Sequence, residues 1–248
     1  MKKVFLFVSI AALSTSAIAQ VNFGAQVGGN MANVTSESTE GGTTVKDKTK
    51  SKFGFLLGVV AQVPLSSSLS FRPELNFIQK GSKQNESSTE TFGGSTITSV
   101  GKAEITLNFI ELPLNIVYSV PAGTGTAFFG AGPSIGYGLS GKSKSDFTVT
   151  TTQTGQPTET ITESDKSDVK FDGKKDEDVA ANDNNAHFKA LDFGGNIMAG
   201  YKLTNGMYIN VGYTMGFSNL NSNANESFKT KGFQVKLGYM FGGNNTED

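Results

Sequence analysis

Seven segments of the chain place apolar residues at odd-numbered positions and polar residues or glycine at even-numbered positions. In the last segment, for example, Phe233, Val235 and Leu237 alternate with Gln234 and Lys236. A period of two is typical of a β-strand whose two faces meet different surroundings. An eighth segment follows the pattern for half its length. We therefore predict eight strands, over residues 21–33, 53–63, 69–79, 103–118, 126–139, 189–203, 207–218 and 230–241.

The connections between these segments alternate between long and short. Long polar connections cover residues 34–52, 80–102, 140–188 and 219–229, whereas tight turns cover residues 64–68, 121–125 and 204–206. This alternation is typical of outer-membrane barrels, which have short periplasmic turns and longer extracellular loops. We predict an all-β fold, an eight-stranded antiparallel up-and-down transmembrane β-barrel with short periplasmic turns and long extracellular loops. The barrel domain covers residues 20–248, including a long loop at about 140–188 and a short C-terminal tail at 242–248. Within the loop, the Thr- and Ser-rich residues 146–164 either extend the neighbouring hairpin above the membrane or are disordered.

The first residues have the features of an export signal. Lys2 and Lys3 precede an apolar run, and Ala17-Ile18-Ala19 is a small-x-small cleavage site, so residues 1–19 are predicted to be a signal peptide. Its removal takes two lysines and leaves 19 basic against 22 acidic residues. This weak balance does not favour nucleic acid as a partner. The signal and the strand pattern together predict the cell outer membrane, with its lipid bilayer as the first partner.

The glycines and aromatics indicate which face of the strands meets lipid. Many glycines lie on the even face, where a narrow eight-stranded lumen leaves little room for side chains. Aromatic residues of the odd face lie near both strand ends, as in the two aromatic girdles of membrane barrels. We expect the odd face to meet lipid. A soluble ligand-carrying barrel with its apolar face inward has the same period and stays the alternative.

The segment 103–118 breaks the common parity. Ile105, Leu107 and Phe109 are odd, but the apolar residues from Ile110 onward are even. A β-bulge near Phe109-Ile110 would absorb this change. Alternatively, the outer part of the strand stands above the bilayer.

Two motifs resemble a known family. They are Phe71-Arg72-Pro73-Glu74-Leu75-Asn76-Phe77, followed by Lys80-Gly81, and Phe109-Ile110-Glu111-Leu112-Pro113-Leu114-Asn115-Ile116. Both are similar to strands of the PorT-like outer-membrane β-barrel family of Bacteroidota. The resemblance covers the mature chain, with departures in the 140–188 loop and the 242–248 tail. It implies an eight-stranded outer-membrane barrel, the barrel-assembly machinery as a partner during insertion, and envelope or secretion proteins as later partners.

The inward faces of two neighbouring predicted strands carry the candidate lumen charges. Arg72 is the only arginine of the chain, Glu74 shares its face, and Glu111 lies on the inward face of the neighbouring predicted strand. An unpaired charge in a narrow lumen is costly, and a guanidinium holds two carboxylates at once, so we predict one structural charge network. Asp192, Lys202 and Lys236 would extend it. A ligand or proton site is the alternative.

Signals for chemistry are weak elsewhere. His187 is the only histidine, and a catalytic histidine needs a nucleophile and an orienting group beside it. The carboxylates of residues 165–178 lack the spacing of a calcium loop, and lysines are interleaved with them. We therefore predict no catalytic residues, no metal and no cofactor, and leave any ligand-binding residues unassigned.

Three hypotheses for the function follow. The first is a non-enzymatic envelope interaction or scaffold protein with a closed lumen. The second is an outer-membrane enzyme that uses His187, and the third is a small channel or porin.

Overall fold

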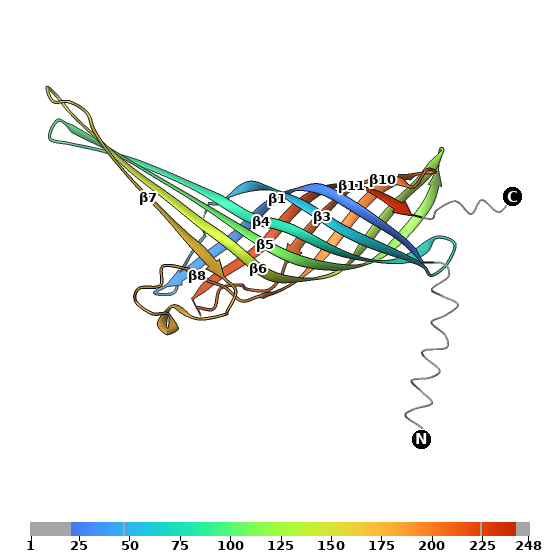
Figure 1. Ribbon diagram of the computed structural model, residues 1–248. Coiled ribbons are helices and arrows are strands. Elements are labelled where there is room, and N and C mark those ends of the chain that lie inside the picture. Colours follow the sequence, from blue (N-terminus) through green and yellow to red (C-terminus); the bar gives the residue numbers. More distant parts are fainter. Residues whose placement is uncertain (1–20, 47, 224, 242–248) are drawn as a thin grey trace, which may run out of the picture.

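Antiparallel pairing closes eight strands into a ring, as the computed structural model of residues 21–46, 48–223 and 225–241 shows (Figure 1). Among these described residues, the ring consists of β1 (Asn22–Glu40), β3 (Lys50–Pro64), β4 (Leu69–Phe92), β5 (Ser95–Ala122), β6 (Gly125–Gln153), β9 (Leu191–Leu203), β10 (Met207–Gly216) and β11 (Glu226–Phe241). Three short or peripheral strands, β2 (Thr43–Lys46), β7 (Glu159–Lys170) and β8 (Ala186–His187), and a 3₁₀ turn, η1 (Asp176–Asp178), lie outside the ring. No helix in the described part of the chain is long and apolar enough to cross a membrane.

The ring closes between the first and the last strand. Phe23 of β1 pairs with Phe241 of β11, and the two strands stay in register as far as Ser38 and Glu226. Each remaining ring strand pairs with its neighbours in chain order once β2, β7 and β8 are set aside. All ring pairings are antiparallel, so the predicted up-and-down barrel is confirmed.

The apolar side chains of the barrel face outward. Phe53, Leu57 and Phe129 are each more than half exposed, whereas Asn76 and Lys236 of the opposite parity are almost completely buried. A soluble barrel would bury the apolar face and expose the polar one, so this arrangement excludes that alternative. Outward apolar and inward polar residues are the arrangement of a barrel that meets lipid.

The prediction that the strand over residues 103–118 changes parity is wrong. Leu107, Phe109 and Glu111 all point into the lumen, so β5 keeps a single parity. The apolar pair at Leu107 and Phe109 packs inside the outer end of the barrel instead of facing lipid. The bulge lies on the neighbouring strand: Asn108 pairs with Ser140 and Phe109 with Gly138, which leaves Leu139 of β6 as the additional residue.

The predicted long loop at 140–188 is largely a sheet, which corrects that prediction and confirms the alternative of an extended hairpin over residues 146–164. Strand β6 continues to Gln153 and pairs with β7, and the 80–102 connection is likewise a hairpin of β4 and β5. Their outer parts form a four-stranded sheet that projects beyond the rest of the barrel, on the side opposite the short turns (Figure 1). We call this sheet the blade: residues 84–92 of β4, 95–103 of β5, 145–153 of β6 and 159–167 of β7.

The blade leaves the barrel where the strands are irregular. The β3–β4 ladder changes register between Ser51 and Leu56, and the β6 bulge lies at Leu139. Between them, Gly81 of β4 has φ +146°, and a Cβ atom there would collide with the carbonyl oxygen of Ile105. Bulges bend strands, and glycine is the residue that adopts such a φ without strain. The predicted signal peptide 1–19 and tail 242–248 lie outside the described residues.

Candidate functional site

The lumen holds a first charge cluster near its inner end. Oε2 of Glu74 accepts hydrogen bonds from Nζ of Lys236 at 2.7 Å and from Nε2 of Gln26 at 2.8 Å. Oε1 of Glu74 lies 3.4 Å from Nε of Arg72. The guanidinium stacks on aromatic rings, with Cζ 4.6 Å from the ring centre of Tyr208. All of these side chains are nearly completely buried. Two cations therefore share one carboxylate, which is the reverse of the arrangement that we predicted for Arg72.

A second cluster lies nearer the outer end. Nζ of Lys80 is 2.6 Å from Oε2 of Glu111 and 3.3 Å from Oδ2 of Asp192, and Thr230 donates to the same Asp192 oxygen at 2.7 Å. Lys80 also lies over the Phe109 ring, 5.0 Å from its centre. Glu111 thus belongs to Lys80 rather than to Arg72. Of the predicted residues, the structure brings Arg72, Glu74 and Lys236 together and places Glu111 with Asp192 in a separate group.

Apolar side chains close the lumen on the outer side of the second cluster and on the inner side of the first cluster. Along β5 the inward residues run from Leu107 and Phe109 through Glu111 and Asn115 to Val117. Leu107 and Phe109 belong to an outer apolar cluster, and Val117 belongs to an inner one that also contains Phe128 and Met240. An eight-stranded barrel has an interior just wide enough for side chains. These layers fill it with charge between two apolar plugs.

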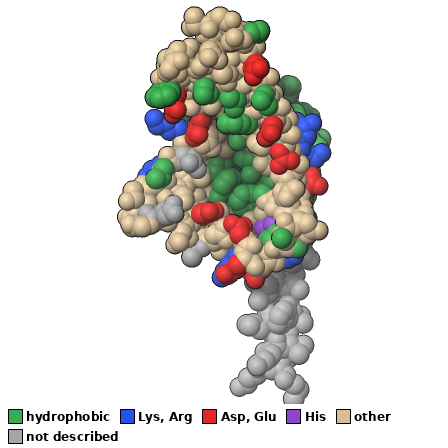
Figure 2. Space-filling model, turned by 90° about the vertical axis from the view of Figure 1, so that its left-hand side faces the viewer, with side chains coloured by type: hydrophobic (Ala, Val, Ile, Leu, Met, Phe, Trp, Pro, Cys, Tyr) green, Lys and Arg blue, Asp and Glu red, His purple; other side chains and the backbone are tan. Residues whose placement is uncertain are grey.

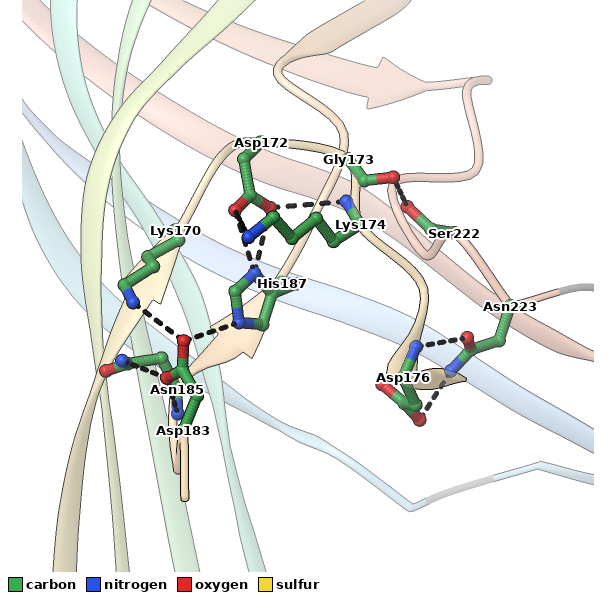
Figure 3. A network of polar contacts seen from close by, with 10 residues as sticks. All are labelled: Lys170, Asp172, Gly173, Lys174, Asp176, Asp183, Asn185, His187, Ser222 and Asn223. Atoms are coloured by element: carbon green, nitrogen blue, oxygen red, sulfur yellow. Dashed lines mark hydrogen bonds and ion pairs between the residues drawn. The ribbon is translucent and has the colours of Figure 1, made fainter. Parts of the chain in front are cut away.

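His187 organises the segment that follows β7 (Figure 3). Its ring lies between two carboxylates: Nδ1 is 2.8 Å from Oδ1 of Asp172, and Nε2 is 3.6 Å from Oδ2 of Asp183. Lys170 holds Asp183 from the other side at 2.9 Å. The side chain of His187 is only 2% exposed. We call this group the histidine clamp: Lys170, Asp172, Asp183 and His187.

The two carboxyl groups of the clamp are held in their charged form. Burial acts to raise the pKa of Asp172, but hydrogen bonds from the His187 ring and the Lys174 backbone N–H keep the pKa below its usual value. The hydrogen bond from Lys170, followed by that from the Asn185 backbone N–H, lowers the pKa of Asp183 well below its usual value. In the described part of the chain, the two ring nitrogens of His187 face these two carboxylates. The ring is therefore held from both sides.

The blade has two unlike faces. Paired residues of adjacent strands lie on the same side of a sheet, so burial at the barrel end assigns each position of the blade. The inner face continues the lumen side of Leu107 and Val169, and it exposes Ile161 (65%), Phe147 (49%) and Ile97 (44%). Viewed onto this end, hydrophobic side chains gather in a hollow and acidic side chains surround it (Figure 2).

The outer face of the blade is polar and internally bonded. Threonine hydroxyls pair across the strands, as between Thr150 and Thr160 at 3.3 Å and between Thr89 and Thr98 at 3.2 Å. Lysines gather toward its base on the same face, where Lys83 is bridged to Glu104 at 3.1 Å. Among the described residues, no group of three His, Cys, Asp or Glu side chains is placed to hold a metal ion.

A comparison with family models decides the identity. The model of the outer membrane protein beta-barrel domain matches residues 14–222. The chain belongs to this family. It is therefore a protein of the cell outer membrane, and the short turns face the periplasm while the blade and the histidine clamp lie outside the cell.

The solved structures that match this one are similar to it only at a coarse level. Ail, the attachment invasion locus protein of Yersinia pestis, was solved with the heparin analogue sucrose octasulfate; it shares 13% identity at a TM-score of 0.30, covering 89% of this chain and 99% of that chain. Neisserial surface protein A shares 14% identity at a TM-score of 0.34, covering 88% of this chain and 97% of its own. Among curated proteins, none matches the sequence.

Sequence reasoning missed two features of this outer-membrane barrel and left a third open. Lys80 was assigned to the loop after the third predicted strand, although its even number continues the parity of Arg72 and Glu74. The clamp partners of His187 come from turns whose course the sequence does not reveal. The extended hairpin over residues 146–164 was one of two alternatives from the sequence, and the pairing of β6 with β7 confirms it. Its junction with the β4–β5 hairpin into one blade was not predicted.

Proposed function

We propose that this protein is a non-enzymatic interaction protein of the outer membrane, in which the barrel is the anchor and the blade is the contact surface. The observation that carries the proposal is the exposed apolar inner face of the blade, with Phe147 and Ile161 about half exposed or more outside the cell. Exposed apolar patches rimmed by polar residues are typical of interaction sites. A barrel that served as an anchor alone would need no such sheet.

The lumen clusters support an anchoring role for the barrel. Arg72, Glu74 and Lys236 form one group with two cations and one carboxylate, and Lys80, Glu111 and Asp192 form another with one cation and two carboxylates. We propose that both groups are structural and fix the positions of the strands around the lumen. The barrel-assembly machinery and the lipid bilayer are then the partners during insertion. The PorT-like motifs favour a partner in protein secretion, a finer role that rests on those motifs alone.

Photo-crosslinking in living cells tests the proposal. A photoreactive phenylalanine analogue is placed at Phe147 on the inner face, at Thr150 on the outer face, and at Phe129 on the lipid face as the control. We expect a protein adduct of defined mass from the Phe147 position and none from Phe129. A trimmed variant, in which two-residue Asn-Gly turns replace residues 84–103 and 145–165, removes the blade but keeps the flanking pairs Lys83–Glu104 and Lys144–Lys166 in hairpin register.

The trimmed variant also provides a test that can contradict the proposal. Heat-modifiable gel mobility first establishes that the variant is a folded barrel. Cells that carry only the trimmed variant should show the same envelope phenotype as cells from which the whole protein is deleted. If the trimmed barrel instead restores the wild-type phenotype fully, the blade is not the contact surface.

Two further experiments address the other hypotheses. His187→Ala should leave any lipid or peptide hydrolysis by the purified protein unchanged, because the ring contacts two carboxylates and no nucleophile. In planar bilayers the folded barrel should be electrically silent, because side chains fill the lumen. Stepwise conductance would favour the channel instead.

A further inference from the structure

The inner face of the blade is organised in rows across its four strands. One row contains Glu90, Ile97, Thr151 and Glu159 in the order β4, β5, β6, β7. The row next but one toward the barrel contains Glu86, Gly101, Phe147 and Glu163. In both rows the outermost strands carry glutamates and the central strands carry uncharged residues. The inner face therefore has an uncharged stripe on its central strands, between glutamates on its two outermost strands that we call the acidic rails.

The row between these two completes the stripe. It contains Ser88, Ser99, Val149 and Ile161. Ile97 of β5 and Phe147 and Val149 of β6 lie on the central strands, and Ile161 lies beside Val149 on β7, between Glu159 and Glu163. These four residues form the apolar strip of the inner face, with Ile161 at one edge. Of the described inner-face positions in residues 84–92, 95–103, 145–153 and 159–167, none is lysine or arginine, so the carboxylates of the rails have no cation on their own face.

The two faces of the blade differ in how far their side chains find partners within the sheet. On the outer face, threonine hydroxyls satisfy one another across the strands, as between Thr148 and Thr162 at 3.1 Å. On the inner face, Ile161 and Phe147 stay exposed although the same strands carry them. A sheet normally buries its apolar face against a second layer. Among the described residues the blade has one layer, and the apolar side chains of its inner face are left uncovered.

We propose that the inner face of the blade binds a cationic amphipathic α-helix of an extracellular polypeptide, which supplies the second layer. The helix places its apolar side on the strip of Ile97, Phe147, Val149 and Ile161, and its lysines or arginines on both flanks reach the two glutamate rails. This inference rests on the proposed function and names the class of partner for the same surface.

The dimensions of the blade fit one helix. Strands lie about 4.8 Å apart, so the rails on β4 and β7 are separated by about 14 Å, and a helix with its side chains is about 10–12 Å wide. Rows on one face repeat about every 6.8 Å along the strands, so the four rows from Ala103 to Ile97 span about 20 Å. A helix of about 14 residues covers that length.

A small cavity at the foot of the inner face provides an anchor point. It has a volume of about 160 Å³, and its walls include Gln84, Ala103, Ile105 and Phe228. Gln84 and Ala103 form the first pair of the blade on this face. One apolar side chain from the barrel-proximal end of the helix can enter this space. Such buried anchors carry much of the affinity of interfaces.

Peptide binding to the full-length barrel in zwitterionic nanodiscs tests the proposal. The probe is a labelled helical peptide of leucine and lysine, with a leucine stripe and lysines on both flanks. A peptide of the same composition with lysines on one flank only, and a leucine–glutamate peptide, serve as controls. Fluorescence anisotropy is compared with nanodiscs that contain the trimmed variant, which corrects for binding to lipid.

We expect the two-flank peptide to bind best. The one-flank peptide should bind about tenfold more weakly, because it loses the charge pairs with one rail. The glutamate peptide should not bind, because its carboxylates repel those of both rails. The double variant Phe147→Asn/Ile161→Asn should weaken binding at least about tenfold. Its matched control, Val100→Asn on the outer face, should leave the affinity unchanged.

A second pair of variants tests the charge of the glutamate rails. Glu159→Gln/Glu163→Gln should weaken binding about tenfold and flatten its dependence on salt, because screening then has fewer pairs to act on. Asp146→Asn on the outer face removes one carboxylate without touching the inner face and should have no effect. Equal affinities for the inner-face and outer-face variants would overturn the proposal.

Other outcomes identify a different occupant or a different failure. A stable dimer in nanodiscs, lost on Phe147→Asn/Ile161→Asn, would show that a second copy covers the face, and the proposal would be wrong. If the two-flank peptide does not bind while the crosslink from Phe147 in cells persists, the inference fails and the proposed function stands. If trimming the blade also leaves the cellular phenotype intact, both fail.

Discussion

Nζ of Lys236 lies 2.7 Å from Oε2 of Glu74, although 162 residues separate them, and both side chains are at most 1% exposed. The contact crosses the lumen from β11, the last ring strand, to β4. Burial of an ion pair costs desolvation, and removal of one partner leaves the other charge uncompensated. The pair therefore ties distant strands together at a point where neither charge can reach water.

Lys236→Met should destabilise the barrel by about 3 kcal/mol, because Glu74 loses its shortest cationic contact in a buried site. Urea unfolding in lipid vesicles measures the change. Lys142→Met, at an exposed position of β6, should stay within about 0.5 kcal/mol of the wild type. A similar loss for both variants would show that the lumen pair has no special role.

Arg72→Met and Glu111→Gln should have additive effects on the free energy of unfolding. Arg72 contacts Glu74, whereas Glu111 contacts Lys80, and the two groups share no partner in the described structure. Independent sites add to within about 0.5 kcal/mol. A coupling energy clearly larger than that, measured with the double variant, would restore the single network that the sequence predicts.

Gly81→Val should disturb the junction between barrel and blade. The φ of +146° is unfavourable for valine, and its Cβ would meet the carbonyl oxygen of Ile105. We expect a loss of at least about 1 kcal/mol and faster proteolysis of the blade. Gly101→Val is the matched control, since a Cβ at Gly101 has open space around it. Equal protease resistance of the two variants would contradict this role of Gly81.

The histidine clamp should weaken in acid. The folded pKa values of Asp172 and Asp183 are depressed, so their contribution is fully present above the unfolded value of about 3.9 and is lost as the pH falls through the folded values. Limited proteolysis of residues 171–187 should therefore accelerate below about pH 4. The variant Asp172→Asn/Asp183→Asn should be cleaved more readily at neutral pH and should lose this acid dependence. An unchanged cleavage profile would argue that other contacts hold the segment.

The eight ring strands and their lipid-facing side follow from local information. Alternation at Phe233, Val235 and Leu237 needs no distant partner to be recognised, because the period of a strand is a property of its own backbone. The inward position of Arg72 and Glu74 follows from the same parity. The prediction from parity was wrong at Leu107 and Phe109. Both are apolar and yet face inward, because they close the lumen.

The sequence by itself therefore determined the strand period, the number of ring strands and the outer-membrane barrel. Only the tertiary structure decided which charges meet inside the lumen, where Lys80 rather than Arg72 holds Glu111. It also decided that the hairpins of β4–β5 and β6–β7 join into one blade with a threonine face and an apolar, acid-railed face. Periodicity is encoded within a few residues, whereas these contacts depend on the register between strands far apart in the chain.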